Sequence, residues 1–185
     1  MKKKIIFLIL FILFLTPSYA SFKEKIINNL EQINNLSFNF EQTINEKTEK
    51  GNCIIEYPKK IFCKYNNINK KIIVSDGKSL VIKNQLSNQY YRYPLKKTPL
   101  SLILNKDYLI SQIKKLDART INNRYLNFTL KDGENKINIF FDNKTLNLVG
   151  WQTEDIYQNL VITFISSIKI NQKIKKNIFN LPKIN

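Results

Sequence analysis

The 185-residue chain contains no histidine, only two cysteines and only four glycines. Without histidine it lacks the commonest general base and the commonest ligand of transition metals. Two cysteines cannot build a structural zinc site by themselves, and neither a glycine-rich phosphate loop nor a G-x-S-x-G turn is present. We therefore expect no catalytic residue, no metal ligand and no cofactor. Nearby acids, such as Glu154 and Asp155, leave a carboxylate-based hydrolase as an alternative.

The first 20 residues have the layout of a secretory signal peptide. Met1–Lys4 is a positively charged start, residues 5–15 form an unbroken apolar run, and Ser18 and Ala20 place small residues at positions −3 and −1. The run is shorter than the roughly 20 residues of a membrane-spanning helix, which leaves an uncleaved anchor as the alternative. We expect cleavage after Ala20, export from the cytosol and one mature domain, residues 21–185.

Positive charge exceeds negative charge throughout the sequence. There are 30 lysine and arginine residues against 14 acids, which gives +16, or +13 once the three lysines of the signal peptide are removed. Such a charge attracts anionic surfaces. The lysines are spread along the chain, so we interpret them mainly as a basic solvated surface. Export argues against nucleic acid as the partner and favours acidic headgroups or acidic proteins.

Apolar residues change their spacing at Ser37. Helical spacing before it predicts an amphipathic helix over residues 22–36, and alternation after it predicts a strand over residues 38–44. Gly51 is expected to open the next strand. Turn residues then separate a series of short strands, which predicts a mainly β protein with a sheet large enough to curl or close. These strands are expected at 52–57, 61–65, 71–75, 79–83, 89–93, near 120, and at 125–130, 136–141, 146–152 and 160–170.

An apolar helix interrupts the series of strands. Thr98 is expected to cap it and Pro99 to occupy its first helical position, so that it covers Leu100–Leu104. A second helical segment is expected over residues 107–114. The first helix is either a lid over the concave face of the sheet or an ordinary part of the core, and the pattern leaves both open.

The two cysteines lie on either side of the turn at Pro58. Cys53 and Cys63 come nearly opposite each other across the expected hairpin, within disulfide reach if the register agrees. An oxidising compartment would join such a pair. The alternative is two small apolar side chains that line the interior.

Several short motifs, in order along the mature chain, resemble the periplasmic outer-membrane lipoprotein carrier family, LolA. Residues 36–42 (LSFNFEQ) are similar to its opening strand, and Gly51 with residues 57–61 (YPKKI) to its first hairpin. Residues 73–80 (IVSDGKSL) are similar to its second hairpin. Residues 98–104 (TPLSLIL) resemble its central lid helix, and residues 179–182 (FNLP) its closing segment.

The resemblance implies a half-open antiparallel β-barrel of about ten or eleven strands, capped by the N-terminal helix and the lid helix. It implies a monomeric carrier that binds acyl chains of lipoproteins. The cargo passes from an inner-membrane lipoprotein-releasing transporter to an outer-membrane acceptor. The residues expected to form the acyl-chain cavity and lid are Leu30, Phe38, Phe40, Ile55, Tyr57, Ile61, Leu80, Ile82, Pro99, Leu100, Leu102, Ile103 and Leu104.

One residue departs from the family pattern. Members often carry arginine before the hairpin proline, where it ties the barrel to the lid, but this chain has Tyr57. A tyrosine donates one hydrogen bond and lacks the fork of an arginine. We therefore take Tyr57 as the latch candidate, with hinges beside Thr98-Pro99 and Asn105-Lys106.

Two other functions on the same fold remain as alternatives. A lipid- or lipoprotein-sensing periplasmic module is the first, although such proteins usually carry a second domain. The outer-membrane acceptor of lipoproteins is the second. An acceptor should be lipid-anchored, and Ser21 stands where its anchoring cysteine would be.

Overall fold

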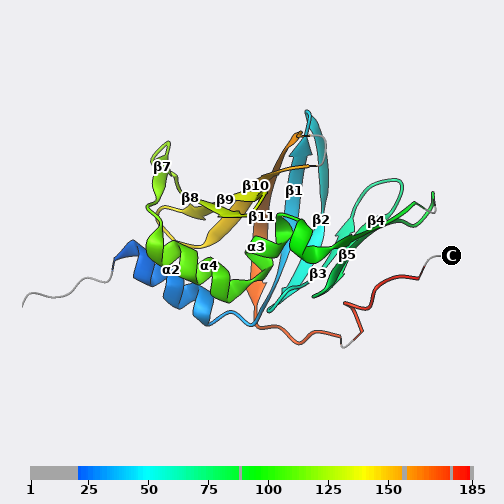
Figure 1. The fold of residues 1–185 in the computed structure, drawn as a ribbon, viewed down its shortest axis with the longest axis horizontal. Helices are drawn as coiled ribbons and strands as arrows, with labels where there is room; N and C mark the ends of the chain where they lie inside the picture. Colours follow the sequence, from blue (N-terminus) through cyan, green and yellow to red (C-terminus); the bar gives the residue numbers. More distant parts are fainter. Residues whose placement is uncertain (1–20, 88, 156–157, 176, 184–185) are drawn as a thin grey trace, which may run out of the picture.

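The computed structural model describes residues 21–87, 89–155, 158–175 and 177–183, so the expected signal peptide lies outside the described residues. The strands are β1 (Asn35–Ile44), β2 (Lys47–Glu56), β3 (Lys60–Tyr65), β4 (Lys71–Asp76), β5 (Ser79–Asn84), β6 (Tyr90–Pro94), β7 (Arg119–Ile121), β8 (Tyr125–Asp132), β9 (Asn135–Asp142), β10 (Leu148–Glu154) and β11 (Leu160–Ile170). They form one 11-stranded sheet in the order β6-β5-β4-β3-β2-β1-β11-β10-β9-β8-β7 (Figure 1). No described pairing joins the edges β6 and β7, which confirms the half-open antiparallel barrel.

The strands form because apolar residues alternate with polar ones, which places one face toward the core. In β1, Leu36, Phe38 and Phe40 are buried and face the concave side. The prediction that Gly51 opens the second strand was wrong, because β2 begins at Lys47. Gly51 lies within β2, where a Cβ atom would come 2.2 Å from the carbonyl oxygen of Lys64 and 2.7 Å from the Phe40 ring. Glycine at position 51 therefore leaves room for the Phe40 ring.

The N-terminal helix α2 (Phe22–Glu31) is shorter than predicted. A capping box fixes its start, because Ser21 and Glu24 each accept a hydrogen bond from the other's backbone N–H. Its end depends on Asn171, whose amide donates to the carbonyl of Gln32 (2.8 Å) and accepts from the N–H of Asn34 (2.8 Å). Asn171, far along the chain, therefore pairs with the backbone groups of the connection that follows α2, and the helix ends before residue 36.

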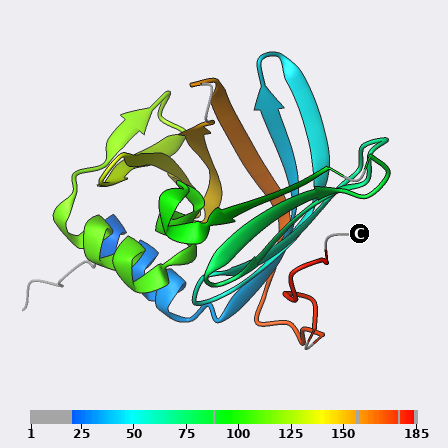
Figure 2. The same cartoon turned by 45° about the vertical axis from the view of Figure 1, so that its right-hand side comes forward.

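The middle of the chain forms a short 3-10 helix, η1 (Leu95–Lys97), followed by α3 (Leu100–Leu104) and α4 (Lys106–Lys115). The predicted helix over Leu100–Leu104 is confirmed, but its predicted cap is wrong. The Thr98 hydroxyl donates backward to the carbonyl of Leu95 (2.8 Å), and Pro99 occupies the cap position. Figure 2 shows the sheet curling around α3, while α2 and α4 lie side by side at one end of the barrel.

The predicted disulfide is confirmed. Cys53 of β2 and Cys63 of β3 are paired residues of the hairpin, with Cα atoms 4.1 Å apart and their sulfur atoms bonded. Both side chains are buried on the concave face. The bridge therefore fastens the inner wall of the barrel.

The C-terminal segment covers part of the convex face. The Lys60 ammonium lies 5.7 Å from the centroid of the Phe179 ring, and the Lys83 ammonium donates to the carbonyl of Lys183 (2.9 Å). Beneath this segment, Val74 and Val81 are 1% and 0% exposed although they point away from the concave core. No helix among the described residues is long and apolar enough to cross a membrane.

Candidate ligand-binding interior

The residues predicted to form the acyl-chain cavity lie together on the concave side of the sheet. Tyr57 and Leu100 pack against the buried core at its border, whereas Ile82 and Pro99 are half-buried outside that core. The predicted residues therefore lie on one continuous apolar surface. The members buried in its centre are Leu30, Phe38, Phe40, Ile55, Ile61, Leu80, Leu102, Ile103 and Leu104.

Helix α3 fills the middle of this apolar interior. Its residues Leu102, Ile103 and Leu104 are at most 2% exposed. One backbone hydrogen bond ties the end of the helix to the barrel, from the N–H of Lys59 to the carbonyl of Leu104 (2.8 Å). An acyl chain in the same place would have to displace these side chains, because they fill this part of the interior.

An apolar groove lies open between α2 and β11. Its volume is about 320 Å³, and Leu30, Leu36 and Leu148 line its floor. Ile168 and Ile170 line its wall while 37% and 46% exposed, which is unusual for large apolar side chains. An apolar ligand in this groove would contact the buried interior while α3 stays in place.

The sequence analysis missed this wall because of a β-bulge. The register of β1 with β11 shifts between Ser37 and Asn39, and Ser167 has a positive φ of 54°. The extra residue reverses which side chains face inward, so Ile168 and Ile170 point to the concave side. Simple alternation from buried Ile165 would have placed them outside.

A lysine just after α3 contacts the end of α2, and the structure does not support the tyrosine latch. Among the described residues, the Tyr57 hydroxyl has no hydrogen-bond partner. Instead, the Lys106 ammonium donates to the carbonyls of Ile33 (2.9 Å) and Glu31 (3.2 Å). It also lies 5.7 Å from the centroid of the Tyr57 ring. Lys106 is the first residue of α4 and is separated from α3 by Asn105 alone, so this cation joins the end of α3 to α2 and to the turn between β2 and β3.

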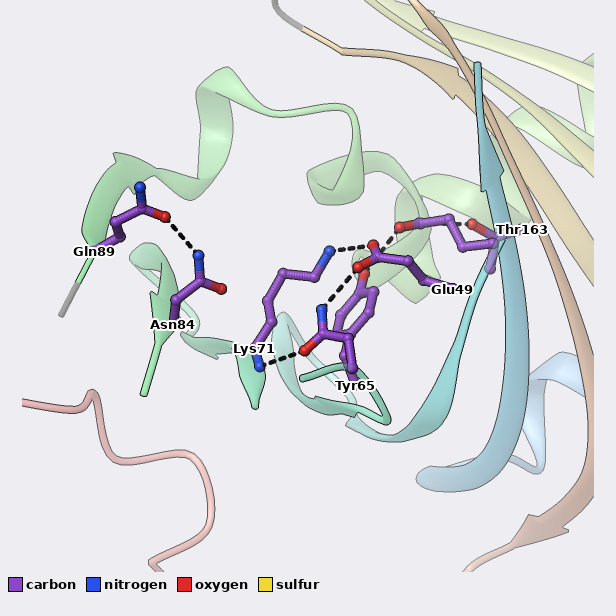
Figure 3. Close-up of polar contacts among 8 residues, drawn as sticks. Glu49, Tyr65, Lys71, Asn84, Gln89 and Thr163 are labelled. Carbon is purple, nitrogen blue, oxygen red and sulfur yellow. Dashed lines mark hydrogen bonds and ion pairs between the residues drawn. The ribbon is translucent and has the colours of Figure 1, made fainter. Parts of the chain in front are cut away.

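The far end of the concave wall is polar. Tyr65 donates to Gln42 (3.0 Å), and Gln42 donates to buried Thr163 (3.0 Å), as Figure 3 shows. The Lys71 ammonium pairs with Glu49 and lies 3.9 Å from the centroid of the Tyr65 ring. Burial raises the pKa of Tyr65, the charge of Glu49 raises it further, and the hydrogen bond to Gln42 opposes the rise. The interior is therefore amphipathic along its length.

No group of acids and cysteines able to hold a metal ion occurs among the residues that the structure describes. The features that do occur are an open antiparallel barrel, a helix inserted into it and an apolar surface with an exposed groove. They define a binding protein for an apolar ligand. The sequence model of the family described as outer membrane lipoprotein carrier protein LolA matches residues 31–182. The chain belongs to this family of periplasmic carriers.

The comparison with solved structures finds similarity at low sequence identity. An uncharacterized conserved protein from Thermus thermophilus has a TM-score of 0.50 and 7% identity, covering 86% of this chain and 94% of its own. A LolA superfamily protein from Nitrosomonas europaea has a TM-score of 0.47 and 10% identity, covering 88% of this chain and 99% of its own. A putative outer membrane lipoprotein-sorting protein domain from Vibrio parahaemolyticus has a TM-score of 0.47 and 8% identity, covering 84% of this chain and 95% of its own. The comparison with curated proteins finds no match.

Proposed function

We propose that this chain is exported, cleaved after Ala20, and carries lipoproteins through the periplasm as a monomer without catalysing a reaction. It binds their acyl chains in the interior beneath α3. It receives them from an inner-membrane lipoprotein-releasing transporter and delivers them to an outer-membrane acceptor. The observation that carries this proposal is the apolar interior with its open groove, which family membership links to lipoproteins.

The physical need for such a protein is large. Each CH₂ group of an acyl chain costs about 0.8 kcal/mol to expose to water. A carrier must cover that surface and still release it, which requires closed and open states of similar free energy. Helix α3 provides the closed state, because Leu102–Leu104 occupy the place that the acyl chains would take.

Native mass spectrometry of the mature protein mixed with a triacylated lipoprotein tests this proposal. We expect a one-to-one complex that is absent with the same lipoprotein lacking its acyl chains. Leu102→Asp or Ile103→Asp should weaken the complex about tenfold or more, since a carboxylate would enter an apolar site. The control Leu160→Asp changes an exposed residue of β11 and should bind normally. Equal binding of the acylated and the non-acylated lipoprotein would refute the proposal.

A further inference from the structure

Two neighbouring loops expose large apolar side chains at one end of the sheet. Ile68, between β3 and β4, is 87% exposed, and Leu86, between β5 and β6, is 62% exposed. The loops are in contact, because the N–H of Leu86 donates to the carbonyl of Asn69 (3.5 Å). We call Ile68 and Leu86 the apolar tips. Exposed apolar side chains gathered in this way mark a contact surface.

Polar anchors hold these loops in place, as Figure 3 shows. In the first loop, the Asn67 amide donates to Glu49 (2.8 Å) and accepts from the N–H of Lys71 (3.0 Å). In the second, the Asn84 amide donates to the side chain of Gln89 (2.7 Å), and their backbones also pair (2.9 Å). The anchors leave the apolar side chains pointing outward while the loop backbones are fixed.

The wall that carries the tips is strongly basic. We call residues 57–105, which contain β3 to β6, η1 and α3, the basic wall; they hold ten lysine and arginine residues and a single acid, Asp76. The Asp76 carboxylate accepts from the backbone N–H groups of Lys78 and Ser79 (2.8 Å each). Lys64 and Lys70 are exposed and form no ion pair with any described residue. Lys60 and Lys71 pair with Glu56 and Glu49 of β2, and the remaining cations, Lys64 and Lys70 among them, leave the wall with net positive charge around the tips.

From these observations we propose that the apolar tips and the basic wall dock the protein on the surface of an anionic lipid bilayer. Apolar side chains that enter the headgroup boundary and lysines that meet lipid phosphates add their contributions to such binding. Tyr91 on edge strand β6 is 48% exposed, and tyrosine favours this interface. A second copy of the chain fits less well, because two basic walls repel each other.

Vesicle sedimentation with the mature chain tests the inference. We expect binding to vesicles of phosphatidylglycerol and phosphatidylcholine, and little to phosphatidylcholine alone. Added salt should weaken the binding, because it screens exposed charges. The pair I68N and L86N should lower the affinity about tenfold, since it removes the inserted apolar surface. The matched control pair, L160N and F164N, changes residues that are 45% and 43% exposed on β11 and should bind normally.

Charge is tested in the same assay. Lys64→Gln with Lys70→Gln should weaken binding several-fold, while Lys25→Gln with Lys115→Gln, on helices α2 and α4, should not. No binding to anionic vesicles at low salt, or equal losses in the test and control pairs, would overturn the inference. So would binding to an acidic protein alone. Docking is independent of acyl binding, so the tip variants should still form the lipoprotein complex.

Discussion

Single residues decide how the lid of this protein is held. The family resemblance directed attention to Tyr57, where an arginine is common, and predicted a hydrogen bond from its hydroxyl. The structure instead places the Lys106 ammonium on the carbonyls of Ile33 and Glu31, above the Tyr57 ring. The cation of this contact therefore belongs to Lys106 and not to the residue before the hairpin proline. No local pattern could reveal this, because the carbonyls lie more than 70 residues before Lys106.

We predict that Lys106→Met loosens the lid. The variant keeps most of the side-chain volume but loses two hydrogen bonds from a charged donor. Because the site is half-buried, their loss should cost about 1 kcal/mol of the closed state. Amide hydrogen exchange of residues 100–104 should then be roughly fivefold faster. Lys106→Arg should restore slow exchange. Tyr57→Phe is the matched control and should leave the rate unchanged; faster exchange there would return the latch to the tyrosine hydroxyl.

Elements show how far the sequence could predict the fold. Alternating apolar residues identified the strands and the face of Phe38, Ile55 and Ile61, because strand periodicity is a local property. The sequence also placed Cys53 nearly opposite Cys63 across the turn at Pro58, while the exact register, which pairs the two residues, came from the structure. The end of α2 and the inward turn of Ile168 did not follow. They depend on Asn171 and on the bulge at Ser167, which act through distant pairing.

At the level of the β2–β3 hairpin, we predict that the disulfide stabilises the barrel. It closes a short loop, with a sequence separation of 10 residues. The chain-entropy relation for a loop of this size gives about 2–3 kcal/mol. Thermal unfolding of the mature protein should therefore occur at a lower temperature with a reducing agent present. Replacing both Cys53 and Cys63 by serine should abolish this sensitivity to the reductant. An unchanged midpoint on reduction of the native protein would contradict the prediction.

At the scale of the whole molecule, positive charge is concentrated on one wall of the sheet. In the sequence, the lysines looked evenly spread, and the net charge was interpreted as a general basic surface. The acids, however, are not spread evenly, because residues 57–105 contain only Asp76. Since β3 to β6 adjoin one another in the sheet, this stretch becomes one wall. Counting both signs of charge along the sequence would have revealed the asymmetry; the loop contacts that expose Ile68 and Leu86 required the structure.

The interior offers its own reporter for the central claim that acyl chains enter the barrel. Trp151 is the single tryptophan of the chain and is 5% exposed. It lies edge-on to Phe38, with ring centroids 6.1 Å apart, on the concave side. A bromine atom on an acyl chain quenches tryptophan fluorescence only at close range. Quenching of Trp151 therefore reports entry of the chain into the interior and is insensitive to binding on the outer surface.

The decisive measurement is a titration of the mature protein with a brominated fatty-acyl ligand and with its unbrominated counterpart. We predict saturable quenching of Trp151 by the brominated chain alone, and weaker quenching in Leu102→Asp because of its charged interior. Competition with the unbrominated chain should restore the fluorescence. If the brominated chain binds the folded protein and the Trp151 fluorescence does not change, then the acyl chain lies outside the barrel and the proposed carrier mechanism is wrong.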